Sequence, residues 1–309
     1  MNRVVVALGG NALLRRGEED TYQEMYRSAR FAAERIADIA VLGWEVVVTH
    51  GNGPQVGRIL LQQDAARAQV HPMPLDVCGA ESQGQIGYLL QVTIGDVFFE
   101  RGMERPVATV LTLTRVRPDD PAFENPTKPV GPYYEEEQAK KVAAEHRWTV
   151  RPDPQSGWRR VVPSPAPYSI VEAPVIAQLI ADGVIVIASG GGGVPVIESG
   201  PRLIGVEGVV DKDAAAAILA RDVEAKVLLD LTDVKGVYRD YGTDGAELIA
   251  SLSLDEARGV LADLDAGSMG PKVRSAVSFL ESGGERAVIA ALDDAADAVE
   301  GRTGTQITP

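Results

Sequence analysis

The chain has 309 residues, 45% of them apolar and 24% charged, and this ordinary globular composition excludes disordered, fibrous and disulfide-rich proteins. The formal net charge is −14 and no basic run occurs, which argues against a nucleic acid or an anionic membrane surface as a partner. The single cysteine, Cys78, cannot form an intramolecular disulfide, and no apolar run approaches the ~20 residues of a membrane span. We therefore expect a cytoplasmic protein without a signal peptide.

Short apolar runs rich in β-branched residues alternate with helix-like segments along the chain. We expect strands at residues 4–8, 45–49, 107–112, 184–188, 226–231 and 287–291. We expect helices at residues 21–42, 53–69, 82–101, 136–145, 170–182, 213–221, 254–262 and 271–282. This alternation predicts an α/β fold in which helices cover a parallel sheet.

Residues 117–167, which we call the arm, interrupt this alternation with a high density of proline. Within the arm, residues 148–151 and 158–162 flank a turn-rich loop and predict a hairpin. A proline-rich hairpin does not fit a wound sheet, so we expect an insertion that projects from the main domain. It either closes over a site or is a passive surface excursion.

Glycine-rich turns follow three of the predicted strands, at the edge where open α/β sheets bind ligands. The candidate binding residues in these turns are Gly9, Gly10, Asn11, Gly51, Asn52, Gly53, Gly191 and Gly192. Glycine lets backbone N–H groups approach an anion closely, and a following helix adds partial positive charge. We expect the three turns to converge on one phosphate-sized anion, although none matches a P-loop or a dinucleotide-binding motif.

Three lysines are candidates for neutralising that anion. Lys212 follows Asp211 at the start of an alanine-rich helix, where Asp211 either caps the helix or orients Lys212 toward a phosphoryl group. Lys272 falls in the first turn of a predicted helix, where a cation opposes the helix dipole and is favoured by an anionic ligand. Lys128 lies between prolines of the arm and is either a solvated side chain or aimed at the site.

General acid–base chemistry has few candidates in this sequence. There are three histidines, and neither a Gly-x-Ser-x-Gly elbow nor a His-Glu-x-x-His zinc motif occurs. Phosphoryl transfer depends mainly on positioning and charge neutralisation, so this scarcity favours it over hydrolytic chemistry.

These motifs together resemble the carbamate kinases of the amino acid kinase superfamily, essentially from end to end. The resemblance is carried by residues 9–13, 49–57, 126–134, 157–165, 189–195, 206–213, 231–238 and 267–273. One departure is Glu81, where the family pattern has an apolar Met. We expect this change to affect packing near Cys78 or a dimer contact.

The resemblance implies reversible phosphoryl transfer between ATP and carbamate, giving ADP and carbamoyl phosphate with Mg²⁺. It implies a three-layer α/β/α sandwich around a mainly parallel sheet of about eight strands, with a protruding hairpin subdomain and a homodimeric assembly. Residues 1–183 would form the carbamate-binding lobe, with the arm as its lid, and residues 184–309 the ATP-binding lobe.

The resemblance also implies roles for single residues. The glycine turns and Asn52 would hold carbamate and the phosphoryl group, with Asn11 supporting them. Lys212 and Lys272 would neutralise charge, with Asp211 as their organiser and Lys128 as the lysine of the lid. The nucleotide pocket would be formed by Thr232, Asp233, Val237, Tyr238, Met269 and Lys272.

Two kinds of alternative remain open from the sequence. One is another activity of the superfamily on a small acid, such as acetylglutamate or a phosphonate. The other is a binding protein without catalysis, either a nucleotide sensor or a phosphate-binding structural protein. The physiological direction is also open, since ATP synthesis during arginine breakdown and carbamoyl phosphate synthesis both fit.

Overall fold

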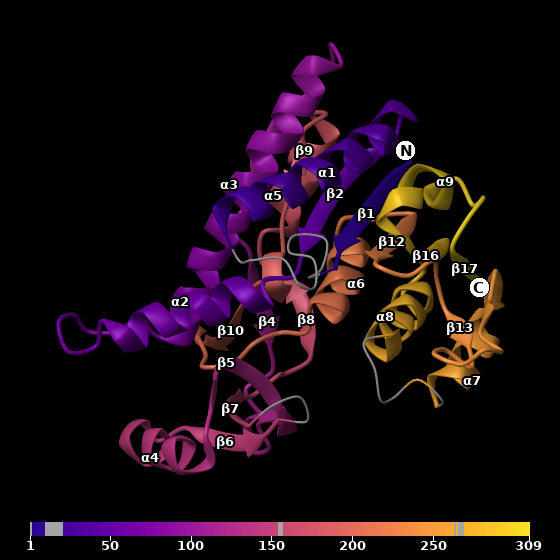
Figure 1. Ribbon diagram of the computed structural model, residues 1–309. Helices are drawn as coiled ribbons and strands as arrows, with labels where there is room; N and C mark the ends of the chain where they lie inside the picture. The colour runs from indigo at the N-terminus through magenta and orange to yellow at the C-terminus, as the bar shows by residue number, and fades with distance from the viewer. Residues whose placement is uncertain (1, 10–20, 154–156, 263, 265–268) are drawn as a thin grey trace.

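The computed structural model describes residues 2–9, 21–153, 157–262, 264 and 269–309, and a mainly parallel eight-stranded sheet forms its centre (Figure 1). In spatial order its strands are β15 (Ser251–Ser253), β17 (Thr305–Thr308), β16 (Arg286–Ala291), β12 (Val227–Thr232), β1 (Arg3–Leu8), β2 (Glu45–His50), β9 (Ile185–Ile187) and β3 (Val107–Thr109). All neighbours run parallel except β16 and β17. The predicted α/β class and parallel sheet are therefore confirmed.

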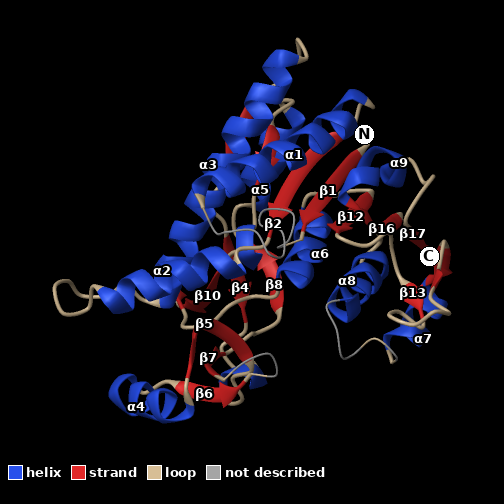
Figure 2. Cartoon of the chain, in the orientation of Figure 1, coloured by secondary structure: helices blue, strands red, loops and turns tan. Residues whose placement is uncertain are grey.

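Helices cover both faces of this sheet and make three layers (Figure 2). Alternate residues of β1 show the division, because Val4, Val6 and Leu8 join one core and Val5 and Ala7 join the other. The first core is closed by α1 (Tyr22–Val41), α3 (Leu75–Glu100) and α9 (Ala295–Val299). The second is closed by α5 (Ala173–Ala181), α6 (Lys212–Asp222), α7 (Leu254–Leu261) and α8 (Met269–Glu281).

Smaller elements form separate sheets outside this sandwich. A four-stranded sheet contains β11 (Arg202–Gly205), β10 (Val194–Ser199), β4 (Leu113–Val116) and β8 (Pro167–Ile170). The remaining short elements are the strands β13 (Tyr238–Arg239) and β14 (Glu247–Leu248) and the 3₁₀ turns η2 (Pro121–Phe123), η3 (Gly190–Gly192) and η4 (Leu292–Asp294). The four-stranded sheet was not predicted, because its strands are short, are interrupted by proline and are partly exposed.

The arm projects from the main body, at the lower end of the view in Figure 1, as predicted. It contains a separate three-stranded antiparallel sheet and one helix: β5 (Lys128–Tyr134), β7 (Trp158–Val162), β6 (Thr149–Pro152) and α4 (Glu136–His146). Helix α2 (Gly53–Ala65), which follows β2, packs against β5 and α3 and so supports the arm.

Several expected boundaries differ from the structure, and three of them have a clear structural reason. Helix α3 begins at Leu75 rather than residue 82, because burial of Leu75 and Cys78 outweighs the weak helix propensity of Gly79. The strand expected at 107–112 ends at Thr109, after which the chain crosses to the smaller sheet. Residue 170 ends a strand, so α5 begins three residues later than predicted.

The expected boundary between two lobes at residue 183 stays a prediction. One continuous sheet contains strands from both sides of that boundary, with β1, β2 and β3 on one side and β9, β12, β16, β17 and β15 on the other. Across the described part of the chain, no helix combines the length and apolar composition that a membrane crossing requires.

Candidate active site

The glycine turns follow neighbouring strands, and their positions define a candidate active site. Strands β12, β1, β2 and β9 are adjacent and parallel, so their carboxyl ends lie at one edge of the sheet. The backbone N–H of Gly9 donates to Leu231 O at 3.0 Å, and that of Gly51 donates to Leu8 O at 3.2 Å. Gly9 therefore lies at this edge beside the end of β12, whereas Gly10 and Asn11 lie outside the described residues.

The second turn starts helix α2 and presents a polar side chain. Asn52 is the residue before the helix, and its Nδ2 donates to Ser82 Oγ at 2.8 Å. Gly53 has open space where a side chain would lie, and it is exposed. The N–H groups at this helix start are therefore suited to an anion.

The third turn requires glycine because its backbone is left-handed and tightly packed. Gly191 has φ +65° and Gly192 has φ +93°. A Cβ at Gly191 would lie 2.1 Å from Asn52 Nδ2, and one at Gly192 would lie 2.5 Å from Val210 O. The second and third turns therefore touch one another, and their convergence on one anion stays a prediction.

Lys212 and Lys272 meet at one carboxylate. Lys212 Nζ lies 2.5 Å and Lys272 Nζ 3.4 Å from Oδ1 of Asp213. Lys272 Nζ also lies 2.7 Å from Oδ1 of Asp230, in β12. The side chain of Lys272 is only 6% exposed, while that of Lys212 is 20% exposed and so more open to a ligand. The two lysines come from different helices, and their ammonium groups contact the same carboxylate.

Asp211 has different partners from those we expected. Its Oδ1 accepts from the backbone N–H groups of Asp213 and Ala214, at 3.0 and 3.3 Å, so it caps α6. Its Oδ2 lies 2.9 Å from Lys128 Nζ of the arm, whose side chain is 43% exposed. The expected organiser of Lys212 and Lys272 is thus corrected: Asp213 and Asp230 contact these lysines, and Asp211 links the arm to the helix start.

The buried charges shift one another's pKa values. Burial alone would raise the pKa of Asp213, but the charges of Lys212 and Lys272 outweigh it and lower that pKa below its ordinary range. Burial raises the pKa of Asp230 to about 6 against the opposing charge of Lys272. Burial would lower the pKa of Lys272, but Asp230 and Asp213 raise it. Lys272 therefore stays charged, and an anion arriving here competes with Asp213 for Lys212.

Sequence reasoning missed Asp230 and the role of Asp213. Asp230 stands alone among apolar residues in β12 and is 3% exposed. A buried carboxylate in an apolar strand needs a charged partner, so this position was a usable signal. The pairing of Asp213 with two lysines depends on packing between α6, α8 and β12, which the sequence pattern does not contain.

The predicted nucleotide residues lie beyond the carboxyl end of β12, in different surroundings. Thr232 Oγ1 donates to Asp233 Oδ1 at 3.1 Å. The ring of Tyr238 lies 5.8 Å from that of Tyr241, and Met269 begins α8. Val237 is fully buried in the core, so its side chain is not available to line a pocket; its N–H donates to Thr305 Oγ1 at 2.8 Å.

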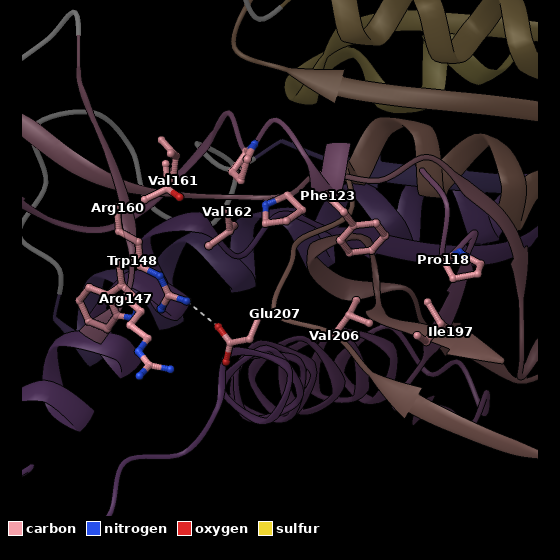
Figure 3. A pocket seen from close by; sticks show the side chains of 13 residues that line it. Pro118, Phe123, Arg147, Trp148, Arg160, Val161, Val162, Ile197, Val206 and Glu207 are labelled. Carbon is pink, nitrogen blue, oxygen red and sulfur yellow. Dashed lines mark hydrogen bonds and ion pairs between the residues drawn. The ribbon is translucent and has the colours of Figure 1, made fainter. Parts of the chain in front are cut away.

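Two cavities lie between the arm and the body, and the sequence did not predict them. One has a volume of about 590 Å³ and the other about 470 Å³, and Arg147, Trp148, Arg160 and Glu207 line both. Figure 3 shows Arg160 extending from the arm toward Glu207, with an Nη2 to Oε2 distance of 2.5 Å. The Arg160 guanidinium also lies 4.5 Å from the centre of the Trp148 ring. These contacts connect the arm to the body away from the lysine cluster.

His50 is unsuited to act as a base in this site. It is fully buried, and burial lowers its pKa to about 4, so the ring is neutral near pH 7. Its Nδ1 lies 2.9 Å from the carbonyl oxygen of Gly51. Among the described residues, no three His, Cys, Asp or Glu side chains are grouped so that they could hold a metal ion.

The family model described as "Amino acid kinase family" matches residues 2–291, which include every strand of the main sheet except β17, together with the glycine turns and the lysine cluster. The chain therefore belongs to the amino acid kinase family. Within this family its similarity is to carbamate kinases. It is 53% identical to the carbamate kinase of Thermococcus kodakarensis and 51% identical to that of Pyrococcus horikoshii, over 99% of this chain and 99% of each relative.

Solved structures agree with this placement. A structure titled "Carbamate kinase from Giardia lamblia bound to AMP-PNP" matches with a TM-score of 0.94 and 42% identity, over 99% of this chain and 98% of that chain. An N-acetylglutamate synthase from Neisseria gonorrhoeae matches with a TM-score of 0.57 at 19% identity, covering 100% of this chain and 59% of that one, which shows a shared fold alone. The family-level resemblance and the three-layer fold are both confirmed.

Proposed function

We propose that this chain is a carbamate kinase that transfers a phosphoryl group reversibly between ATP and carbamate, giving ADP and carbamoyl phosphate. The observation that carries this proposal is the meeting of Lys212 and Lys272 at Asp213, at the sheet edge where the glycine turns end. The full-length similarity to carbamate kinases supports the choice of acceptor.

The acceptor side of the proposed site consists of backbone donors and one amide. Carbamate has few heavy atoms and almost no apolar surface, so the N–H of Gly53 at the start of α2 and the Asn52 amide are suited to bind it. The N–H groups of Gly9 and Gly51 already donate to Leu231 O and Leu8 O, so we propose that these two glycines let the backbone approach carbamate closely. Gly191 lets the third turn approach Asn52 closely, and Gly192 lets it approach Val210. We propose the same setting for Gly10 and Asn11.

Charge neutralisation is the main catalytic contribution that we assign to the protein. The carbamate oxygen is already an anion, so its attack on the γ-phosphorus needs no general base, in keeping with the neutral, buried His50. Lys212 and Lys272 stabilise the negative charge on the phosphoryl oxygens in transit, and Asp213 keeps the two ammonium groups together. Lys128 adds a third cation from the arm, held beside the site by Asp211.

We propose that the nucleotide binds beyond β12 and at the start of α8, beside Thr232, Asp233, Tyr238 and Met269. Val237 supports this region through the core. Mg²⁺ is proposed as the metal that accompanies the nucleotide and supplies further neutralisation of the phosphates. The described residues offer no cluster of three carboxylate or imidazole ligands, which fits a metal held mainly by phosphates and water.

We propose a cytoplasmic homodimer that works in arginine metabolism. One face of α3 leaves Val77, Tyr88 and Phe99 exposed, with Tyr88 at 60% and Phe99 at 86%. Glu81 is exposed on the same face. A second copy of the chain would cover these apolar side chains. Sedimentation at twice the 32.8 kDa of one chain would support this assembly, and a monomer at micromolar concentration would contradict it.

The proposed activity is tested by ATP formation from ADP and carbamoyl phosphate by the purified protein. We expect turnover with this donor, and little ADP release when ATP is offered with acetylglutamate or a small phosphonate. Rapid ADP release from ATP with one of those acids, together with no ATP formation from ADP and carbamoyl phosphate, would show that the acid and not carbamate is the substrate. ATP binding without any turnover would instead support a nucleotide sensor.

A further inference from the structure

Helix α3 contacts both of the touching glycine turns through two adjacent side chains. Ser82 and Gln83 are 0% and 2% exposed, on the inner face of the helix. Neither residue belongs to the lysine cluster, which is formed by α6, α8 and β12. The hydrogen bonds of these two side chains indicate the role of this buried polar pair.

Ser82 fixes the orientation of the Asn52 amide. The hydroxyl of Ser82 donates to Gly79 O at 2.7 Å, so its oxygen is left to accept from Asn52 Nδ2 at 2.8 Å. This direction of donation places the amide nitrogen toward α3 and sets the plane of the Asn52 side chain. A Cβ on Gly191 would overlap that same amide, so the amide also determines where the third turn lies.

Gln83 fixes the third turn through Thr112. The Gln83 side chain accepts from Thr112 N at 2.9 Å and donates to Thr112 O at 3.0 Å. Thr112 Oγ1 in turn accepts from Ser189 N at 2.9 Å and donates to Val110 O at 2.8 Å. Ser189 has a left-handed backbone, with φ 55°, that is unusual outside glycine and needs such support.

We infer that Ser82 and Gln83 are positioning residues, which hold the Asn52 amide and the 189–193 turn in register on the acceptor side of the site. This inference rests on the proposed function. The inference places α3 beside the part of the site that binds the acceptor, because the predicted nucleotide-binding residues lie on other elements. Loss of Ser82 should therefore affect the acceptor more than the nucleotide.

Ser82→Ala removes the oxygen that accepts from Asn52 and leaves the helix otherwise intact. We expect the KM for carbamoyl phosphate to rise about tenfold, as for the loss of one buried hydrogen bond, while the KM for ADP stays within about twofold. Gln83→Met should act in the same direction, because it leaves the peptide groups of Thr112 unpaired. In an Asn52→Ala background, Ser82→Ala should cause little further change.

Thr93→Val is the matched control. Thr93 is a buried hydroxyl residue of the same helix, and its Oγ1 donates only to Leu89 O and Leu90 O within α3. We expect both KM values to stay unchanged in this variant. If Ser82→Ala does not fold, Ser82→Cys keeps a weak acceptor of similar size and should raise the KM for carbamoyl phosphate by a smaller factor.

Three outcomes would overturn the inference: unchanged KM values in a folded Ser82 variant, equal rises for both substrates, or the same rise in Thr93→Val. Turnover of the unmodified protein with carbamoyl phosphate is the reference. Its absence would refute the proposed function, whereas normal turnover with an unaffected Ser82→Ala refutes the positioning role alone.

Discussion

At the scale of single residues, the buried cluster of Lys272, Asp213 and Asp230 is explained better by function than by stability. Removing charges from water is costly, and a buried ion pair often stabilises a fold no more than apolar residues would. Such a cluster does hold ammonium groups at a defined place, which an active site for anions requires. We therefore expect the residues of this cluster to contribute both to the charge balance of the buried site and to catalysis.

Lys272→Met should separate these two effects. We expect a loss of about 3–5 kcal/mol in the free energy of unfolding, because Asp213 and Asp230 would face one another buried and without this cation. Adding Asp230→Asn should recover part of the stability but none of the turnover. Urea unfolding and ATP formation measure the two effects, and an unchanged unfolding free energy in the single variant would contradict the role of the cluster.

His50 should make the stability of the protein depend on pH. Its pKa is about 4 when folded and about 6.5 when exposed, so the unfolded chain binds an extra proton between these values. The contribution of neutral His50 is complete above pH 6.5 and is lost as the pH falls toward 4, at up to about 1.4 kcal/mol per pH unit.

His50→Gln should flatten the pH dependence of the unfolding free energy in that window, measured by urea unfolding at a series of pH values. His71→Gln is the control, because it makes the same substitution at an exposed histidine. Equal slopes for the unmodified protein and His50→Gln would show that His50 does not carry a proton on unfolding.

The sequence predicted some site residues better than others. Gly191 and Gly192 could be found because glycine is required where the backbone is left-handed and crowded, and such a requirement is local. Asp213 and Asp230 were missed as partners of the lysines, because their roles arise from contacts between distant elements. The partner expected for the lysines was wrong for the same reason.

At the scale of elements, two ion pairs attach the arm to the body among the described residues. Lys128 contacts Asp211 at the start of α6, and Arg160 contacts Glu207 on the body. Glu207 Oε1 also accepts from Leu75 N at 3.0 Å, at the start of α3. The second attachment therefore connects the arm to a helix that contacts the glycine turns.

Arg160→Ala should loosen the arm without unfolding the body. It removes both the Glu207 ion pair and the stacking on Trp148, and we expect hydrogen exchange in β6 and β7 to become about tenfold faster. Arg151→Ala is the control, because Arg151 is exposed and bonds Asn125 within the arm, at 2.6 Å. Unchanged exchange in Arg160→Ala, or equal acceleration in the control, would rule out this attachment.

The strands and helix ends that were predicted, and those that were missed, show which structural features a sequence pattern records. The strands of the main sheet were predicted because burial on both faces leaves continuous apolar runs, as in β1, β2 and β12. The smaller sheet was missed because β11 is exposed along its whole length and has no such run. The early start of α3 depends on tertiary burial, which local propensity does not record.

At the scale of the whole molecule, the order of the strands creates the site. Neighbouring strands β12, β1, β2 and β9 are far apart in sequence but end at one edge. The overall architecture could be predicted because alternating strands and helices allow few arrangements. The cavities beside the arm could not be predicted, because they depend on how the arm packs against the body.

The turnover of Lys212→Ala in the ATP-forming assay tests most directly whether these distant segments neutralise one migrating phosphoryl group. We predict a rate about 10²–10³-fold lower than that of the unmodified protein. Lys226→Ala, which removes a lysine paired with Glu285 at 3.1 Å, should stay within about twofold of the unmodified rate. Near-normal turnover in a folded Lys212→Ala protein would contradict this account.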